Sequence, residues 1–179
     1  MATRTAITWE EFLASAVEGQ KCEWIDGEVV QMSPVNLPRE RVIALLIEYL
    51  VDYCRLHREW FWFPSNGAFT MASGNWRLPD ASLVRKERFP GGRVTVNMAG
   101  FAPDVAFEIL SRSNSPSYIQ RKRKDYQESG VIQVWIDPDL RLVEVIYIDR
   151  PSCYFQESQT LVIDTLPQFS LNLSSPFST

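Results

Sequence analysis

The spacing of apolar residues predicts helices in two parts of the chain. Over residues 38–58, apolar side chains recur every three or four positions, which is the spacing that lines one face of an α-helix: Val42, Leu45, Leu46, Tyr49, Leu50, Tyr53 and Cys54. A second helix is predicted after the Ser/Asn/Pro-rich stretch 111–117, and Gly130 is a typical stop after it. Thr8 and Glu11 form a capping box that predicts a further short helix.

Between the helical segments, runs of apolar and β-branched residues predict strands. Residues 22–25 and 28–32 flank Asp26-Gly27, a dipeptide typical of a hairpin turn. The stretch 103–111 alternates, with Val105, Phe107 and Ile109 on one face. Its opposite face carries Asp104, Ala106, Glu108 and Leu110. Further strands are predicted at 60–63, 67–71, 77–84, 131–136 and 142–148, with weaker signals at 153–155 and 160–163.

The chain length and the absence of a linker predict one domain over residues 1–179. The helix at 38–58 is expected to cover one face of a sheet. Residues 85–100, which are charged and contain Gly91-Gly92, are expected to form a long exposed loop. No apolar run approaches the roughly 20 residues that span a bilayer, and residues 1–8 lack a secretory core, so a cytoplasmic location is predicted.

Composition narrows the chemistry that the protein can perform. The single histidine, His57, excludes a zinc site built on several histidines and is expected to be a cation at a helix C-terminus. Cys22, Cys54 and Cys153 form no paired metal motif and are expected to be buried thiols. The net charge of −4 disfavours broad electrostatic binding of nucleic acid, although a local basic patch stays possible. Catalysis must therefore use carboxylates, lysine, tyrosine or a metal held by carboxylates.

Two Pro-Asp dipeptides mark candidate acidic sites at strand starts. Asp104 and Glu108 point the same way but lie about 13 Å apart along one strand, too far to bind one metal ion together. Asp80, at the preceding strand, is the available partner, so we expect Asp80 to lie beside Glu108. The alternative is that Pro-Asp is a strand-entry turn and that Glu108 is solvated on an open sheet face.

Lys122 is expected to point toward the sheet. On a helical wheel it lies between Ile119 and Tyr126 within a sector of about 60°. A desolvated ammonium requires a carboxylate partner, and Glu108 is a reasonable one. Two alternatives stay open: the lysine extends along the helix edge to water, or Arg123 on the flank of the stripe takes its place.

An ordered set of segments gives the chain a family resemblance. The segments are Trp24-Ile25-Asp26-Gly27-Glu28-Val29-Val30, Met32-Ser33-Pro34, Leu78-Pro79-Asp80, Pro103-Asp104-Val105-Ala106-Phe107-Glu108-Ile109-Leu110-Ser111, Lys122 with Tyr126 and Gly130-Val131, and Trp135-Ile136-Asp137-Pro138. Over about residues 8–148 the chain resembles a bacterial restriction endonuclease-like family, abundant in cyanobacteria, of the PD-(D/E)XK nuclease superfamily. The resemblance implies a restriction-endonuclease-like α/β core, with a central mixed sheet flanked by helices and a divalent-metal site at one end.

Residue by residue, the resemblance implies that Asp80 and Glu108 are the metal-binding acids. The superfamily's usual lysine position, two residues after the second acid, holds Leu110, and Lys122 on the following helix would replace that lysine. Glu23 matches a recurrent family acid that would help to hold metal or water. The family's usual histidine at the start of the long helix is missing from residues 38–41.

The resulting hypothesis is a Mg²⁺-dependent DNA endonuclease, with Mn²⁺ as a possible substitute. Asp80, Glu108 and the carbonyl of Ile109 would hold the ion, and Lys122 would position water and stabilise developing negative charge. A run of basic residues would contact the flanking phosphates or else form a solvated helix face. This basic run consists of Arg112, Arg121, Arg123 and Lys124. The alternative hypothesis is a catalytically silent, nuclease-like scaffold or oligomeric binding protein. A homodimer is plausible under either hypothesis.

Overall fold

The structure is a computed structural model that describes residues 22–31, 37–95, 98–112 and 114–177. The helix predicted after Thr8 and the segment Met32-Ser33-Pro34 lie outside these residues. In the described part of the chain no helix is long and apolar enough to cross a membrane.

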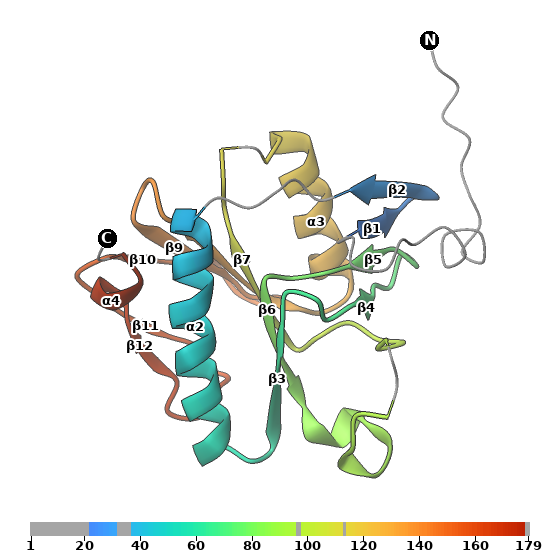
Figure 1. The fold of residues 1–179 in the computed structure, drawn as a ribbon, viewed down its shortest axis with the longest axis horizontal. Coiled ribbons are helices and arrows are strands. Elements are labelled where there is room, and N and C mark those ends of the chain that lie inside the picture. Colours follow the sequence, from blue (N-terminus) through green and yellow to red (C-terminus); the bar gives the residue numbers. More distant parts are fainter. Residues whose placement is uncertain (1–21, 32–36, 96–97, 113, 178–179) are drawn as a thin grey trace.

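A mixed six-stranded sheet forms the centre of the described structure (Figure 1). The parallel pair β7 and β8 lies in its middle, and every other neighbouring pair is antiparallel. In spatial order the strands are β10 (Cys153–Gln156), β9 (Leu142–Ile146), β8 (Ile132–Asp137), β7 (Val105–Ile109), β6 (Ala81–Arg85) and β3 (Trp60–Pro64). The implied central mixed sheet is therefore confirmed.

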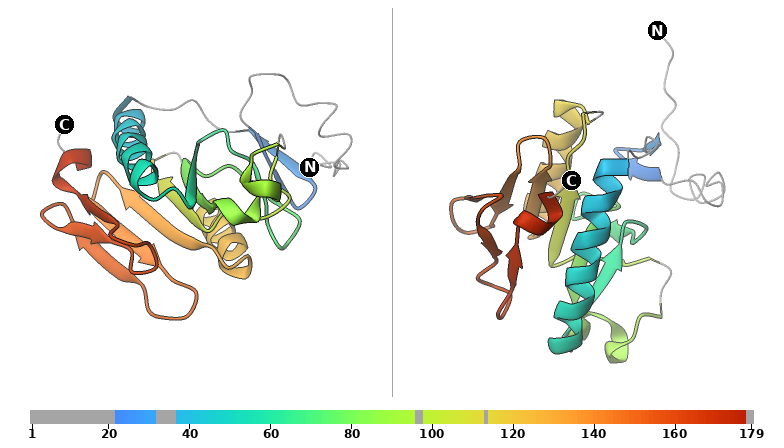
Figure 2. Two further views of the ribbon diagram at one scale, coloured as in Figure 1. Left: turned by 90° about the horizontal axis from the view of Figure 1, so that it is seen from below. Right: turned by 60° about the vertical axis from the view of Figure 1, so that its left-hand side comes forward.

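Helices cover both faces of this sheet (Figure 2). Helix α2 (Leu37–Leu56) packs on the face that carries Val105, Phe107 and Ile109. Helix α3 (Pro116–Glu128) covers the other face, where Tyr126 packs with Ala106 in a second core. The alternation predicted for residues 103–111 thus describes a strand buried on both sides, as expected for the centre of a sheet flanked by helices.

A smaller sheet adjoins the site described below. Its order is β2 (Glu28–Gln31), β1 (Cys22–Ile25), β5 (Trp76–Arg77) and β4 (Phe69–Thr70). Asp26 and Gly27 both have positive φ, 51° and 81°, as the predicted Asp-Gly hairpin turn requires. The prediction of one strand over 77–84 was wrong: β5 and β6 belong to different sheets. Pro79 lies between them and has no N–H for a strand ladder.

Two further expectations are corrected, and two elements were not predicted. Residues 85–100 are not simply an exposed loop, because two short 3₁₀ helices, η1 (Lys86–Arg88) and η2 (Pro90–Gly92), flank the buried side chain of Phe89. The cysteines are not buried thiols: Cys22 and Cys54 are half-buried, and Cys153 is exposed because β10 is an edge strand. At the C-terminal end, β11 (Thr160–Val162) pairs with the unpredicted β12 (Ser170–Asn172), and α4 (Ser174–Phe177) follows.

The long helix ends close to its predicted end. Leu56 is its last residue, and His57 follows it, with its N–H donating to the carbonyl of Tyr53 at 2.9 Å. The His57 ring stacks on Tyr53 and lies 3.6 Å from a Glu59 carboxyl oxygen. His57 is thus at the helix C-terminus, as expected, and lies among structural contacts.

Candidate functional site

Asp80 and Glu108 lie next to each other at one end of the central strands. Ala81 pairs with Phe107 in the antiparallel β6–β7 ladder, so Asp80, one residue earlier, lies across from Glu108. The exposed fraction is 1% for Asp80 and 5% for Glu108. The backbone N–H of Ile109 donates to Asp80 Oδ2 at 2.9 Å. The predicted geometry is present, and the alternative of a solvated Glu108 is wrong because α3 covers this face.

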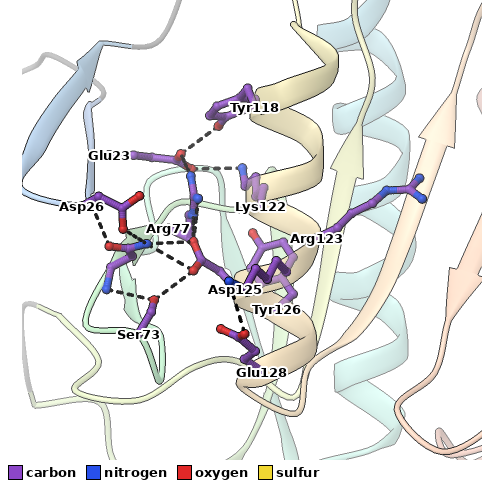
Figure 3. A network of polar contacts seen from close by, with 12 residues as sticks. Glu23, Asp26, Ser73, Arg77, Tyr118, Lys122, Arg123, Asp125, Tyr126 and Glu128 are labelled. Carbon is purple, nitrogen blue, oxygen red and sulfur yellow. Dashed lines mark hydrogen bonds and ion pairs between the residues drawn. The ribbon is translucent and has the colours of Figure 1, made fainter.

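Lys122 points from α3 onto Glu108 and Glu23. Its Nζ lies 2.8 Å from Glu108 Oε1. The same Nζ lies 3.0 Å from Glu23 Oε1 (Figure 3). The residue is only 1% exposed, so extension of the lysine to water is ruled out. Arg123 does not take its place, since its guanidinium pairs with Glu144 at 2.6 Å and lies over the Trp135 ring.

Glu23 is held by contacts from β5, from the residue that follows it and from α3. It accepts hydrogen bonds from the Leu78 N–H at 3.1 Å and from the Tyr118 hydroxyl at 2.8 Å. Arg77 Nη1 lies 2.9 Å from Glu23 Oε2, the oxygen that also accepts from Tyr118. Burial alone raises the pKa of the Glu23 carboxyl, but Lys122 and Arg77 outweigh burial and hold that pKa below its usual value. Glu23 is therefore a buried, ionised partner of Lys122.

Glu108 has the opposite electrostatic balance. Burial raises the pKa of the Glu108 carboxyl to about 7. The positive charge of Lys122 opposes this shift, and the nearby negative charge of Asp80 adds to it. The Tyr126 hydroxyl donates to Glu108 Oε1 at 2.5 Å. Burial lowers the pKa of Lys122, but Glu108 and Glu23 outweigh it, so the pKa lies well above its ordinary value. Lys122 is thus a permanent buried cation between two carboxyl groups.

Arg77 and Asp125 complete the network and were missed by the sequence analysis. The fully buried Arg77 joins Glu23 to Asp125, with Nε donating to Asp125 Oδ2 at 2.7 Å (Figure 3). Asp125 also accepts from Ser73 at 2.9 Å. A signal existed: Tyr118, Lys122 and Asp125 are four and three residues apart, a spacing that places them on one helix face.

Arg39 in the first turn of α2 was also missed. Its Nη2 donates to Asp80 Oδ1, and its Nε donates to the carbonyl of Ile109 at 2.9 Å. This is the region, 38–41, where the family resemblance leads one to expect a histidine. The sequence signal was therefore present as a departure from the family pattern, and the structure shows that an arginine of this region contacts the candidate site.

The remaining predicted residues lie farther from these acids. Asp104 accepts from the Arg85 N–H at 2.8 Å and pairs with Arg88 at 3.3 Å, beyond the other end of β7. Three members of the basic run have acidic neighbours: Arg112 pairs with Asp139, Arg123 with Glu144 and Lys124 with Glu128. Arg121 is exposed on α3.

The oxygen atoms of this site suit a hard divalent cation. Asp80 Oδ1 and the Ile109 carbonyl both accept hydrogen bonds from one cationic group, the Arg39 guanidinium. Glu108 lines the same pocket as Arg39, Ile109 and Lys122. Mg²⁺ and Mn²⁺ prefer carboxylate and carbonyl oxygens, so the residues present fit such an ion. No group of three or more acidic, His or Cys side chains is arranged for a metal among the described residues, so the carbonyl is needed as a ligand.

The fold and the site define an α/β protein with a restriction-endonuclease-like core. A crystal structure from Anabaena variabilis ATCC 29413, described as a "putative nuclease belonging to DUF820", has this fold with a TM-score of 0.83. The match covers 96% of this chain and 97% of that chain at 21% identity. The chain belongs to the Uma2 family, described as "Putative restriction endonuclease", whose model matches residues 9–174. No curated protein matches the chain. The predicted family is therefore confirmed.

Proposed function

We propose that this protein is a Mg²⁺-dependent endonuclease that hydrolyses phosphodiester bonds of DNA, with Mn²⁺ as a substitute ion. The observation that carries this proposal is the convergence of Asp80, Glu108 and Lys122 in one buried cluster at the edge of a pocket. Membership of a family described as "Putative restriction endonuclease" supports the same activity. The PD-(D/E)XK assignment rests on this arrangement of two acids and a lysine.

Asp80, Glu108 and the Ile109 carbonyl are the groups that would hold the ion. A divalent cation supplies charge that polarises a phosphate and promotes deprotonation of a water. The chain contributes to the same chemistry by fixing the acids before the ion arrives. The Ile109 N–H orients Asp80 at 2.9 Å, and the Tyr126 hydroxyl orients Glu108 at 2.5 Å.

Lys122 is the group that would act on the substrate directly. It lines the pocket, and its raised pKa keeps it positively charged at neutral pH. A fixed positive charge in a site shielded from water stabilises negative charge that develops on a phosphate oxygen, and it orients the attacking water. Glu23 and Tyr118 hold this ammonium and are positioning residues in this account, since Glu23 contacts Lys122 at 3.0 Å and Tyr118 at 2.8 Å.

DNA is the proposed substrate because α3 and the loop before it carry exposed cations that can contact phosphates. Arg121 and Lys124 are exposed on α3, and Arg112 is exposed before it. Their salt bridges to Asp139 and Glu128 are at the surface, where such pairs contribute little and exchange readily for phosphate. A homodimer that cuts both strands stays a prediction.

A catalytically silent scaffold is the second candidate, and one contact favours it. The Arg39 guanidinium donates to Asp80, the first candidate metal ligand. If that contact were permanent, the site would be neutralised without a metal ion, and the cluster would serve only to join α2, α3 and the central sheet.

Cleavage assays test the proposal against this scaffold. Purified protein is incubated with supercoiled plasmid, linear duplex DNA, single-stranded DNA and RNA, with Mg²⁺, Mn²⁺ or EDTA. We expect the plasmid to be nicked or linearised with metal only, and Asp80→Asn to abolish this cleavage. Asp139→Asn, which changes an exposed acid paired with Arg112, is the matched control and should cleave like wild type. Cleavage by Asp80→Asn at the wild-type rate would remove Asp80 from the mechanism, and no cleavage by wild type would favour the scaffold.

A further inference from the structure

We infer that Arg39 is a built-in competitor of the divalent cation: its guanidinium occupies the cation position between Asp80 and the Ile109 carbonyl and must leave when the ion binds. This inference rests on the proposed function, because it concerns the same acids. It adds a residue that controls how tightly the site binds metal.

Arg39 contacts two of the three proposed metal ligands. Nη2 donates to Asp80 Oδ1, and Nε donates to the Ile109 carbonyl at 2.9 Å. Asp80 Oδ2 is used differently, since it accepts from the backbone of Ile109 at 2.9 Å. The guanidinium and a metal ion would therefore use the same two oxygen atoms, so they cannot both occupy them.

The formal charge of the cluster favours replacement of the Arg39 guanidinium by a divalent ion. The described side chains joined by these contacts comprise four carboxylates and three cations: Glu23, Asp80, Glu108 and Asp125, with Arg39, Arg77 and Lys122. The acidic groups outnumber the cations, and Glu108 would bind an ion as its carboxylate. With all four carboxyl groups ionised, the formal sum is −1 with Arg39 in place and zero with a divalent ion in its place. The ionised cluster is therefore better balanced with the ion than with the arginine.

Arg39 is also placed where departure is easy. Its side chain is 12% exposed, whereas those of Lys122 and Arg77 are 2% and 0% exposed. It projects from the first turn of α2, where a positive charge opposes the helix dipole. Of the three cations, the long side chain of Arg39 is therefore the one that would reach water most readily.

Metal binding measured without any substrate tests the inference. Mn²⁺ affinity is determined by titration calorimetry and by the electron paramagnetic resonance signal of free Mn²⁺, for wild type, Arg39→Gln and Arg41→Gln. Arg41 is the matched control, since it is an exposed arginine two residues away on the same helix. We expect Arg39→Gln to bind Mn²⁺ about tenfold more tightly than wild type, the order expected for loss of one competing charge-assisted bond. Arg41→Gln should change the affinity little.

The outcomes separate this inference from the proposed function. If Arg39→Gln binds Mn²⁺ no more tightly than wild type while Asp80→Asn abolishes binding, the metal site stands and competition by Arg39 is overturned. If neither wild type nor Arg39→Gln binds Mn²⁺, both proposals fail. Circular dichroism checks the fold of each variant, and Arg39→Lys serves if Arg39→Gln does not fold. A lysine cannot make both bonds of the planar guanidinium, so Arg39→Lys should also bind Mn²⁺ more tightly than wild type.

Discussion

The ammonium of Lys122 lies 2.8 Å from a carboxyl oxygen of Glu108, inside the protein and away from water. This contact joins α3 to the central strand β7. The same ammonium reaches Glu23 in the smaller sheet at 3.0 Å, so one side chain links three parts of the fold. Truncation of one partner of a buried ion pair leaves an uncompensated charge, which makes this cluster a determinant of stability as well as a candidate site.

Removal of the Lys122 charge should therefore affect both the stability of the fold and the activity of the candidate site. Lys122→Met preserves much of the side-chain volume but leaves Glu23 and Glu108 without their shared cation, so we expect a loss of about 3 to 5 kcal/mol in the free energy of unfolding. Urea denaturation measures this loss. Lys124→Met is the control, because Lys124 is exposed and lies 3.7 Å from Glu128. Metal-dependent cleavage should vanish in Lys122→Met and persist in Lys124→Met. Equal stability of the two variants would contradict the role assigned to the contact.

The raised pKa of Glu108 predicts a pH-dependent difference between wild type and Glu108→Gln. Between about pH 4.5, the ordinary value, and about pH 7, the folded state keeps a proton on Glu108 that the unfolded state releases. Proton release on unfolding means that the contribution of Glu108 to stability falls as pH rises through this range. Glutamine has no such proton. As the pH rises through this range, Glu108→Gln should therefore gain stability relative to wild type, by up to roughly 3 kcal/mol.

Unfolding by urea at about pH 5 and about pH 8 measures this difference, and Glu48→Gln on the exposed face of α2 is the control. A gap between wild type and Glu108→Gln that stays constant over this range would show that the Glu108 carboxyl titrates normally.

Arg77 should be needed for stability because it is fully buried between two acids. Its guanidinium reaches Glu23 at 2.9 Å and Asp125 at 2.6 Å. Arg77→Met leaves both carboxylates short of a partner, and we expect a loss of about 3 to 5 kcal/mol. Arg77→Lys should recover only part of it, because an ammonium lacks the planar fork that serves two carboxylates. Thermal or urea unfolding gives the comparison, with the exposed Arg121→Met as control. Full recovery in Arg77→Lys would argue against the two-sided geometry.

The positions of Lys122 and Glu108 could be predicted because each depends on local periodicity. The helical wheel placed Lys122 toward the sheet, and strand alternation placed Glu108 opposite the face of Val105, Phe107 and Ile109. Both patterns need only neighbouring residues. The buried setting of these groups required the tertiary structure, since the same alternation is compatible with an open sheet face.

Arg39 and Arg77 could not be found in this way, because their partners are remote in the chain. Arg77 contacts Glu23 across 54 positions and Asp125 across 48, and Arg39 contacts Asp80 across 41. No local spacing encodes such pairs. The break at Pro79 was missed for a similar reason. The strand pattern over residues 77–84 is continuous, so it does not show that the chain passes there from the smaller sheet to the central one. The exposure of Cys153 likewise depends on β10 lying at the sheet edge.

The most direct test of the account is to locate Mn²⁺ in crystals of the wild-type protein by anomalous scattering. The account predicts a peak within roughly 2.0 to 2.6 Å of carboxylate oxygens of both Asp80 and Glu108 and of the Ile109 carbonyl, with Arg39 displaced. Crystals of Asp80→Asn should lack this peak. An Mn²⁺ peak elsewhere in the molecule, or none at saturating Mn²⁺ with Arg39 still bonded to Asp80, would contradict the proposed metal site.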